Sequence, residues 1–192
     1  MKSAAQKNYM TRSVIKIETT PQDHHIAKMA ALAIALAIAE AVVPSPLPGV
    51  KPGLANIITL VVLARYGVKA AIWVSLLRVV AGSLLLGTFL SPSFILSFSG
   101  AVASLAVLAL AHALPRKLFG PVSASILAAF AHIMGQLAVV YLWLIPHAGL
   151  AYLVPIFAAA ALLFGVINGL VAAKLLEPHS APTDYNLVVA RP

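Results

Sequence analysis

Apolar residues dominate long stretches of the chain, and short polar clusters separate them. The apolar runs cover residues 26–43, 54–64, 70–90, 94–114, 122–145 and 150–176. A helix needs roughly 20 apolar residues to cross a bilayer, and all but the second run approach that length. The pattern therefore predicts an all-α integral membrane protein, a bundle of about six transmembrane helices in one domain over residues 26–176. Polar tails are expected at residues 1–25 and 177–192.

Basic residues mark every second connection between the apolar runs. Arg65 and Lys69 follow the second run, Arg116 and Lys117 follow the fourth, and Lys174 closes the sixth. Short loops rich in lysine and arginine stay in the cytoplasm. This pattern predicts a protein of the cytoplasmic or inner membrane with both termini in the cytoplasm. Its first run also resembles a signal peptide with a small-residue cleavage site, and that alternative leaves the later loops on the same sides.

The composition narrows the function classes. Hydrophobic residues make up 61% of the 192 residues and charged residues only 9%, where soluble domains carry about a quarter. The net charge of +8 is spread between apolar runs, so the lipid bilayer explains it better than a nucleic acid does. The chain has no cysteine, which excludes disulfides and thiolate chemistry.

Motifs of catalysis are missing as well. Aspartate occurs only at Asp23 and Asp184, and no GxxxxGK[ST] phosphate loop is present. A prenyl transfer that uses magnesium and a diphosphate needs clustered carboxylates, and ATP hydrolysis by that route needs the loop. We therefore expect no enzyme activity of these kinds from the chain alone, and no cofactor or metal site.

Polar groups inside the apolar runs are the candidate ligand contacts, because an ionisable group in a bilayer is costly. Arg78 lies within the third run, where it could bind an anion, serve a proton-coupled site, or form a structural ion pair with Glu40. Lys51, just before the second run, reads either as an anion contact or as an interfacial anchor. Asn56 reads as a ligand contact or an interhelical hydrogen bond, as does Asn168.

Two further patterns are set by helical spacing. His132 and Gln136 are four residues apart and share one helix face, where they could contact a ligand or a neighbouring helix. Small residues repeat every four positions in the first run, which lets helices approach closely. These stripes predict either packing inside the bundle or a docking surface for a partner membrane protein, formed by Ala31, Ala33, Ala35 and Ala37.

Three motifs together resemble the membrane family of Gx transporters, whose members are also described as heptaprenyl diphosphate synthase component I. The motifs are PLPGVKPGLANIITL at residues 46–60, RVVAGSLLLGTFLSPSFILSFSG at 78–100 and AHIMGQL at 131–137. The resemblance covers about residues 28–176. Pro52 departs from it, since an apolar residue such as leucine is expected there.

This resemblance implies a fold similar to the substrate-binding S components of energy-coupling-factor transporters. Such a protein has an alanine-rich first helix that docks on a coupling protein with ATPases, and a pocket on the outer side. The expected function is uptake of a small, possibly anionic molecule through contacts from Lys51, Asn56, Arg78, His132 and Gln136. The alternative is a noncatalytic membrane subunit that works with a prenyltransferase catalytic subunit in isoprenoid or quinone biosynthesis. A structural assembly factor is a third reading.

Overall fold

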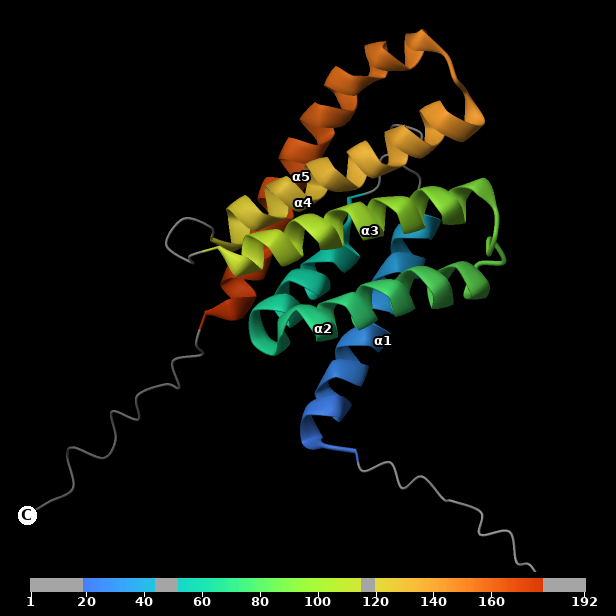
Figure 1. The fold of residues 1–192 in the computed structure, drawn as a ribbon. Coiled ribbons are helices and arrows are strands. Elements are labelled where there is room, and N and C mark those ends of the chain that lie inside the picture. The colour runs from blue at the N-terminus through green and yellow to red at the C-terminus, as the bar shows by residue number, and fades with distance from the viewer. Residues whose placement is uncertain (1–18, 44–51, 115–119, 178–192) are drawn as a thin grey trace, which may run out of the picture.

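The computed structural model describes residues 19–43, 52–114 and 120–177, and these residues form helices and no strand. All of the long helices are apolar enough to cross a membrane, so the chain is a multi-pass membrane protein, as the sequence predicts. In chain order the elements are α1 (Pro21–Val42), α2 (Leu54–Leu85), α3 (Pro92–Ala113), α4 (Pro121–Val139), a π-helical turn (Val140–Leu144), a 3₁₀ turn (Ala148–Leu153) and α5 (Val154–Leu176) (Figure 1).

A sharp bend divides α2 into two arms. Gly67 has a φ of 83° and a ψ of −177°, which glycine adopts easily because it has no Cβ. The predicted second and third apolar runs are therefore the two arms of one bent helix, which reconciles five helices with six apolar segments. At a rise of about 1.5 Å per residue, the first arm (54–66) reaches about 20 Å, less than the roughly 30 Å hydrocarbon core.

The bend lies at the end of the bundle where α5 finishes. Arg65 donates a hydrogen bond from Nη2 to the carbonyl oxygen of Leu175 over 2.8 Å, and Figure 1 shows the bend beside the red end of α5. Ile26 of α1 packs against the same cluster as Tyr66 and Leu176. The beginning of α1, the bend and the end of α5 thus share one end of the molecule, the arrangement expected if their basic residues face the same side.

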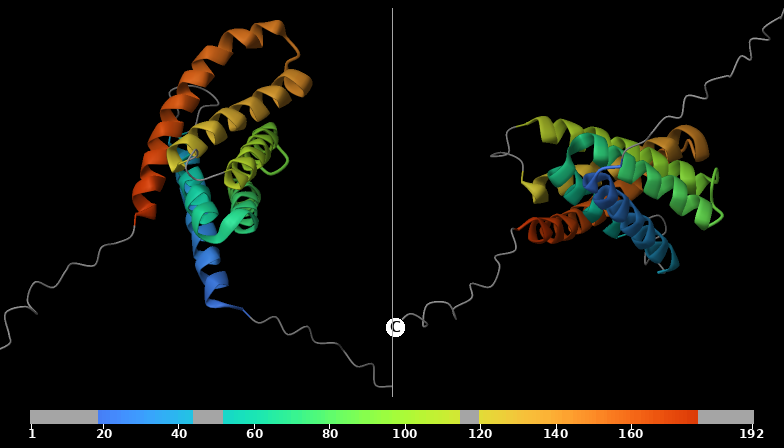
Figure 2. Two further views of the ribbon diagram at one scale, coloured as in Figure 1. Left: turned by 60° about the vertical axis from the view of Figure 1, so that its left-hand side comes forward. Right: turned by 90° about the horizontal axis from the view of Figure 1, so that it is seen from below.

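Neighbouring helices pack in pairs, α1 on α2, α3 on α4 and α4 on α5, and the two views in Figure 2 show these pairs from different sides. Glycines allow the closest approaches. A Cβ placed on Gly169 of α5 would lie 2.6 Å from Cα of Val122, and one on Gly165 would lie 2.9 Å from Cα of Ile126. The two glycines form a GxxxG motif, which lets membrane helices meet backbone to backbone.

Candidate ligand-binding cavity

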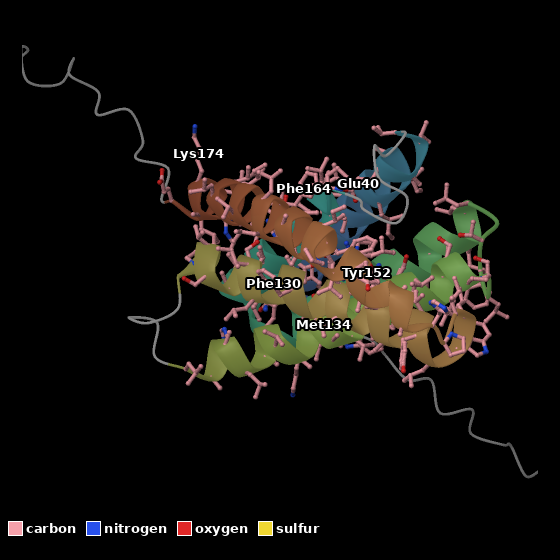
Figure 3. All side chains as sticks on the ribbon, turned by 90° about the horizontal axis from the view of Figure 1, so that it is seen from above. Glu40, Phe130, Met134, Tyr152, Phe164 and Lys174 are labelled. Carbon is pink, nitrogen blue, oxygen red and sulfur yellow. The ribbon has the colours of Figure 1, made fainter. Side chains whose placement is uncertain are left out.

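A cavity of about 590 Å³ lies among the helix ends opposite the bend, within the usual size of about 300–1,000 Å³ for small-molecule sites. All five helices line it, together with the turns that follow α2 and α4. Glu40 of α1 and Phe164 of α5, both labelled in Figure 3, belong to its wall. The described helices therefore surround a large, partly open cavity whose size suits a small molecule.

Four of the five residues that the sequence indicates as ligand contacts line this cavity: Asn56, Arg78, His132 and Gln136. They come from both arms of α2 and from α4. Lys51 lies outside the described residues. Three further polar residues, which were not predicted, also line the cavity: Thr88, Ser93 and Ser97. Of these, Ser93 and Ser97 are four residues apart on α3, a spacing that marks one polar face of an apolar helix.

Arg78 is the charged group deepest in the described structure. It is only 7% exposed, and its Nε atom has no hydrogen-bond partner among the described residues. Arg78 and Glu40 line the same cavity, yet the described part of the chain contains no ion pair between them. An unpaired buried charge is costly, so the described residues leave this guanidinium without the counter-charge that a buried arginine usually has.

Glu40 has a different partner. Its carboxylate accepts a hydrogen bond from the backbone N–H of Leu54, the first residue of α2. Gly53, which precedes that residue in a left-handed conformation, has no side chain to cap the helix. An acidic group at a helix N-terminus satisfies a free N–H and offsets the positive end of the helix dipole. Glu40 thus caps α2 from α1, a role that its position in the sequence did not reveal.

Asn168 holds the chain just before α2. Its Nδ2 atom donates to the carbonyl oxygens of Pro52, over 2.9 Å, and Gly53, over 3.2 Å. Asn168 is only 5% exposed, so these bonds lie inside the helix bundle, where a carbonyl without a donor costs free energy. Asn168 is therefore an interhelical hydrogen-bonding residue, one of its two sequence interpretations.

Replacing Asn168 with leucine should lower the free energy of unfolding by about 1–3 kcal/mol, because it leaves two carbonyls unsatisfied in an apolar environment. Denaturant titration of the purified protein in detergent micelles measures this. Ile167→Leu, at the exposed neighbouring position, is the matched control and should leave the unfolding free energy unchanged. Equal stability of both variants would mean that the two carbonyls are satisfied in another way.

His132 and Gln136 share one face of α4, as their four-residue spacing predicts. Nε2 of Gln136 lies 3.2 Å from Nε2 of His132, and both residues face the cavity. The imidazole sits directly on Gly100 of α3, where a Cβ would lie 2.7 Å from the ring. Since the ring is held between two helices, it presents its polar pair to the cavity in a fixed orientation.

Aromatic and aliphatic side chains complete the cavity. Phe94, Phe157 and Phe164 line it together with several leucines and isoleucines. Phe94 also contacts Phe89 and Phe98, with ring centroids 4.9 Å and 5.8 Å away. The cavity is thus amphipathic, with polar groups and apolar side chains both in its lining.

The alanines of α1 fall on two faces. Ala33 is 0% exposed and Ala37 lines the cavity, with its Cβ 4.0 Å from where a Cβ on Gly82 would lie. These two alanines serve packing inside the bundle, so the docking surface predicted for all four residues cannot include Ala33. Ala31 and Ala35 are exposed, and a docking role for them remains a prediction.

The family model described as heptaprenyl diphosphate synthase component I matches residues 29–175, more than half of the chain and all the helices that line the cavity. No curated protein and no solved structure matches the chain.

Proposed function

The chain belongs to the heptaprenyl diphosphate synthase component I family, and we propose that it is a membrane-embedded substrate-binding subunit that captures a small anionic molecule. The observation that carries this proposal is Arg78, a buried guanidinium without an ion-pair partner in the described residues, on the wall of a 590 Å³ cavity. A carboxylate or phosphate of the ligand would supply the missing negative charge through charge-assisted hydrogen bonds.

The other side chains of the cavity define the rest of the ligand. Asn56, His132 and Gln136 can orient polar atoms, and Lys51 is proposed as a further anion contact. The phenylalanine wall favours an apolar portion, because burying apolar surface contributes about 25 cal/mol per Å². The proposed ligand is therefore an amphipathic anion whose charged end meets Arg78.

The proposed orientation follows from the basic residues. With Arg65, Lys69 and Lys174 in the cytoplasm, the cavity end of the bundle faces outward, and both termini lie inside. Exposed aromatic residues support these membrane boundaries, with Tyr141, Trp143 and Tyr152 near the cavity end and Trp73 toward the bend. Such a subunit works in uptake together with a partner that supplies energy, as S components do.

A second function is favoured by the family description itself. Component I of a synthase implies a catalytic partner, and a chain with only two aspartates needs a partner to perform metal-assisted prenyl transfer. In this alternative the chain is the noncatalytic membrane subunit beside a prenyltransferase. A prenyl diphosphate also joins an anionic head to an apolar chain, the chemistry that the cavity favours.

Native mass spectrometry of the full chain, purified in mild detergent from its own membrane, tests both functions. Uptake predicts one retained anionic molecule per chain and co-purification with a coupling protein and ATPases. The synthase subunit predicts co-purification with an aspartate-rich prenyltransferase, and its deletion should change the length of prenyl products. A chain that retains no ligand, and whose deletion changes neither uptake nor prenyl products, would contradict both and favour an assembly role.

A further inference from the structure

A second, much smaller cavity lies deeper in the bundle. Its volume is about 20 Å³, and a volume of about 10–15 Å³ is enough for one water molecule. Its lining holds five side chains with neutral oxygen atoms from four helices: Asn56 and Thr59 of α2, Ser104 of α3, Ser125 of α4 and Asn168 of α5. The remaining lining is leucine and alanine, so a single small guest would meet oxygen atoms on several sides.

Two of these oxygens are buried acceptors without a donor. Oγ1 of Thr59 and Oδ1 of Asn168 have no hydrogen-bond partner among the described residues, and the two side chains are only 2% and 5% exposed. The orientation of the Asn168 amide is settled by chemistry, because its nitrogen faces the two carbonyls of Pro52 and Gly53. Its oxygen must therefore be the unpartnered end, and a hydrogen-bond donor or a cation in the cavity can satisfy it.

We infer that this cavity binds one monovalent cation of about the size of Na⁺. Five side chains with oxygen atoms line the cavity, more than the roughly three hydrogen bonds that one buried water makes. Hard cations prefer oxygen ligands, and side-chain oxygens are among them. Because no carboxylate lines the cavity, its neutral oxygens can solvate a single charge but cannot balance the two charges of a divalent ion at this depth.

The site is joined to the large cavity through a shared wall. Asn56, Ala129 and Asn168 line both cavities. A cation on Oδ1 of Asn168 polarises the amide and strengthens the hydrogen bonds that its nitrogen donates, because such bonds reinforce one another in an apolar medium. The cation should therefore stabilise the start of α2. Two charged groups line the neighbouring cavity: Arg78 opposes a cation at this site, and Glu40 favours one.

Binding of ²²Na⁺ to the purified full chain in detergent tests the inference, together with thermal unfolding in NaCl, KCl and N-methylglucamine chloride at equal ionic strength. We expect saturable binding of one Na⁺ per chain and a higher melting temperature in NaCl than in the other two salts. Thr59→Val keeps the shape of the side chain and removes its oxygen. It should abolish both effects while the protein still unfolds cooperatively in N-methylglucamine chloride.

The matched control is Ser99→Ala, which removes a hydroxyl that bonds to the carbonyl of Leu96 within α3 and lines neither cavity. This variant should bind Na⁺ as the wild type does. If Thr59→Val fails to fold, Ser104→Ala takes its place. Equal melting temperatures in the three salts, with no saturable ²²Na⁺ binding, would overturn the inference in favour of an ordered water. Undiminished Na⁺ binding by the folded variants would also overturn it, because the ion would then bind elsewhere.

Discussion

Replacing Arg78 with glutamine is expected to abolish capture of an anionic ligand and to leave the protein as stable as the wild type, or more stable. Removing one partner of a buried, hydrogen-bonded charge pair costs about 2 kcal/mol or more, which is roughly a 30-fold loss of affinity. Stability should not fall, because the guanidinium has no ion-pair partner among the described residues when the ligand is absent. Native mass spectrometry measures the retained ligand, and denaturant titration measures the unfolding free energy.

The same experiment separates a binding role from a structural one. If Arg78 and Glu40 formed a structural ion pair, breaking it would cost about 3–5 kcal/mol of stability. Arg78→Lys keeps the charge but loses the planar fork, so it should bind the ligand weakly rather than not at all.

Glu40→Gln is the informative partner variant. It should retain the ligand, because the amide oxygen can still accept from Leu54 and a negative charge has left the cavity. Normal ligand retention by Arg78→Gln would contradict the proposed site.

Replacing Gly169 with alanine should destabilise the bundle by about 1–3 kcal/mol, the usual cost of overpacking a well-packed interface. The added Cβ would lie 2.6 Å from Cα of Val122 and 3.0 Å from Cβ of Ser125. The first of these atoms is backbone, so α4 and α5 must move apart to accommodate the methyl group. Denaturant titration in micelles measures the loss, and a larger residue such as valine should prevent folding.

Gly82→Ala is the matched control for this change. Gly82 is also a glycine within a membrane helix, but its Cβ would meet the nearest atom, Cβ of Ala37, at an ordinary 4.0 Å. Alanine is favoured over glycine in helices by about 1 kcal/mol, so this variant should be neutral or more stable. A Gly169→Ala variant as stable as Gly82→Ala would show that the α4–α5 contact is not closely packed.

Most of the architecture could be predicted from local patterns along the chain. The apolar runs correspond to the membrane helices, and the break between the second and third runs falls at Gly67. His132 and Gln136 share a face because four residues make about one helical turn. Helix starts were less certain: α1 begins at Pro21, five residues before the predicted run, because Thr20 and Asp23 form a capping box on its first turn.

The candidate site was only partly predictable. An arginine or an amide in an apolar run stands out by its cost in a bilayer, so Arg78 and Asn56 could be selected from sequence alone. The partner of Glu40 could not be predicted from the sequence. Its place at the end of α1 fits both an ion pair with Arg78 and a cap on α2. The small residues of α1 fit both internal packing and a docking surface, and the GxxxG motif of α5 was not predicted as a helix contact.

The sequence by itself determined which segments enter the membrane and which of their polar residues are costly there. These properties depend on the composition and periodicity of each helix alone. Only the tertiary structure decided that Arg78, Asn56, His132 and Gln136 share one cavity, that Glu40 caps α2, and that Asn168 binds the chain before α2. The physical reason is that helical periodicity relates residues within one helix, whereas the rotation and depth of each helix against its neighbours depend on packing.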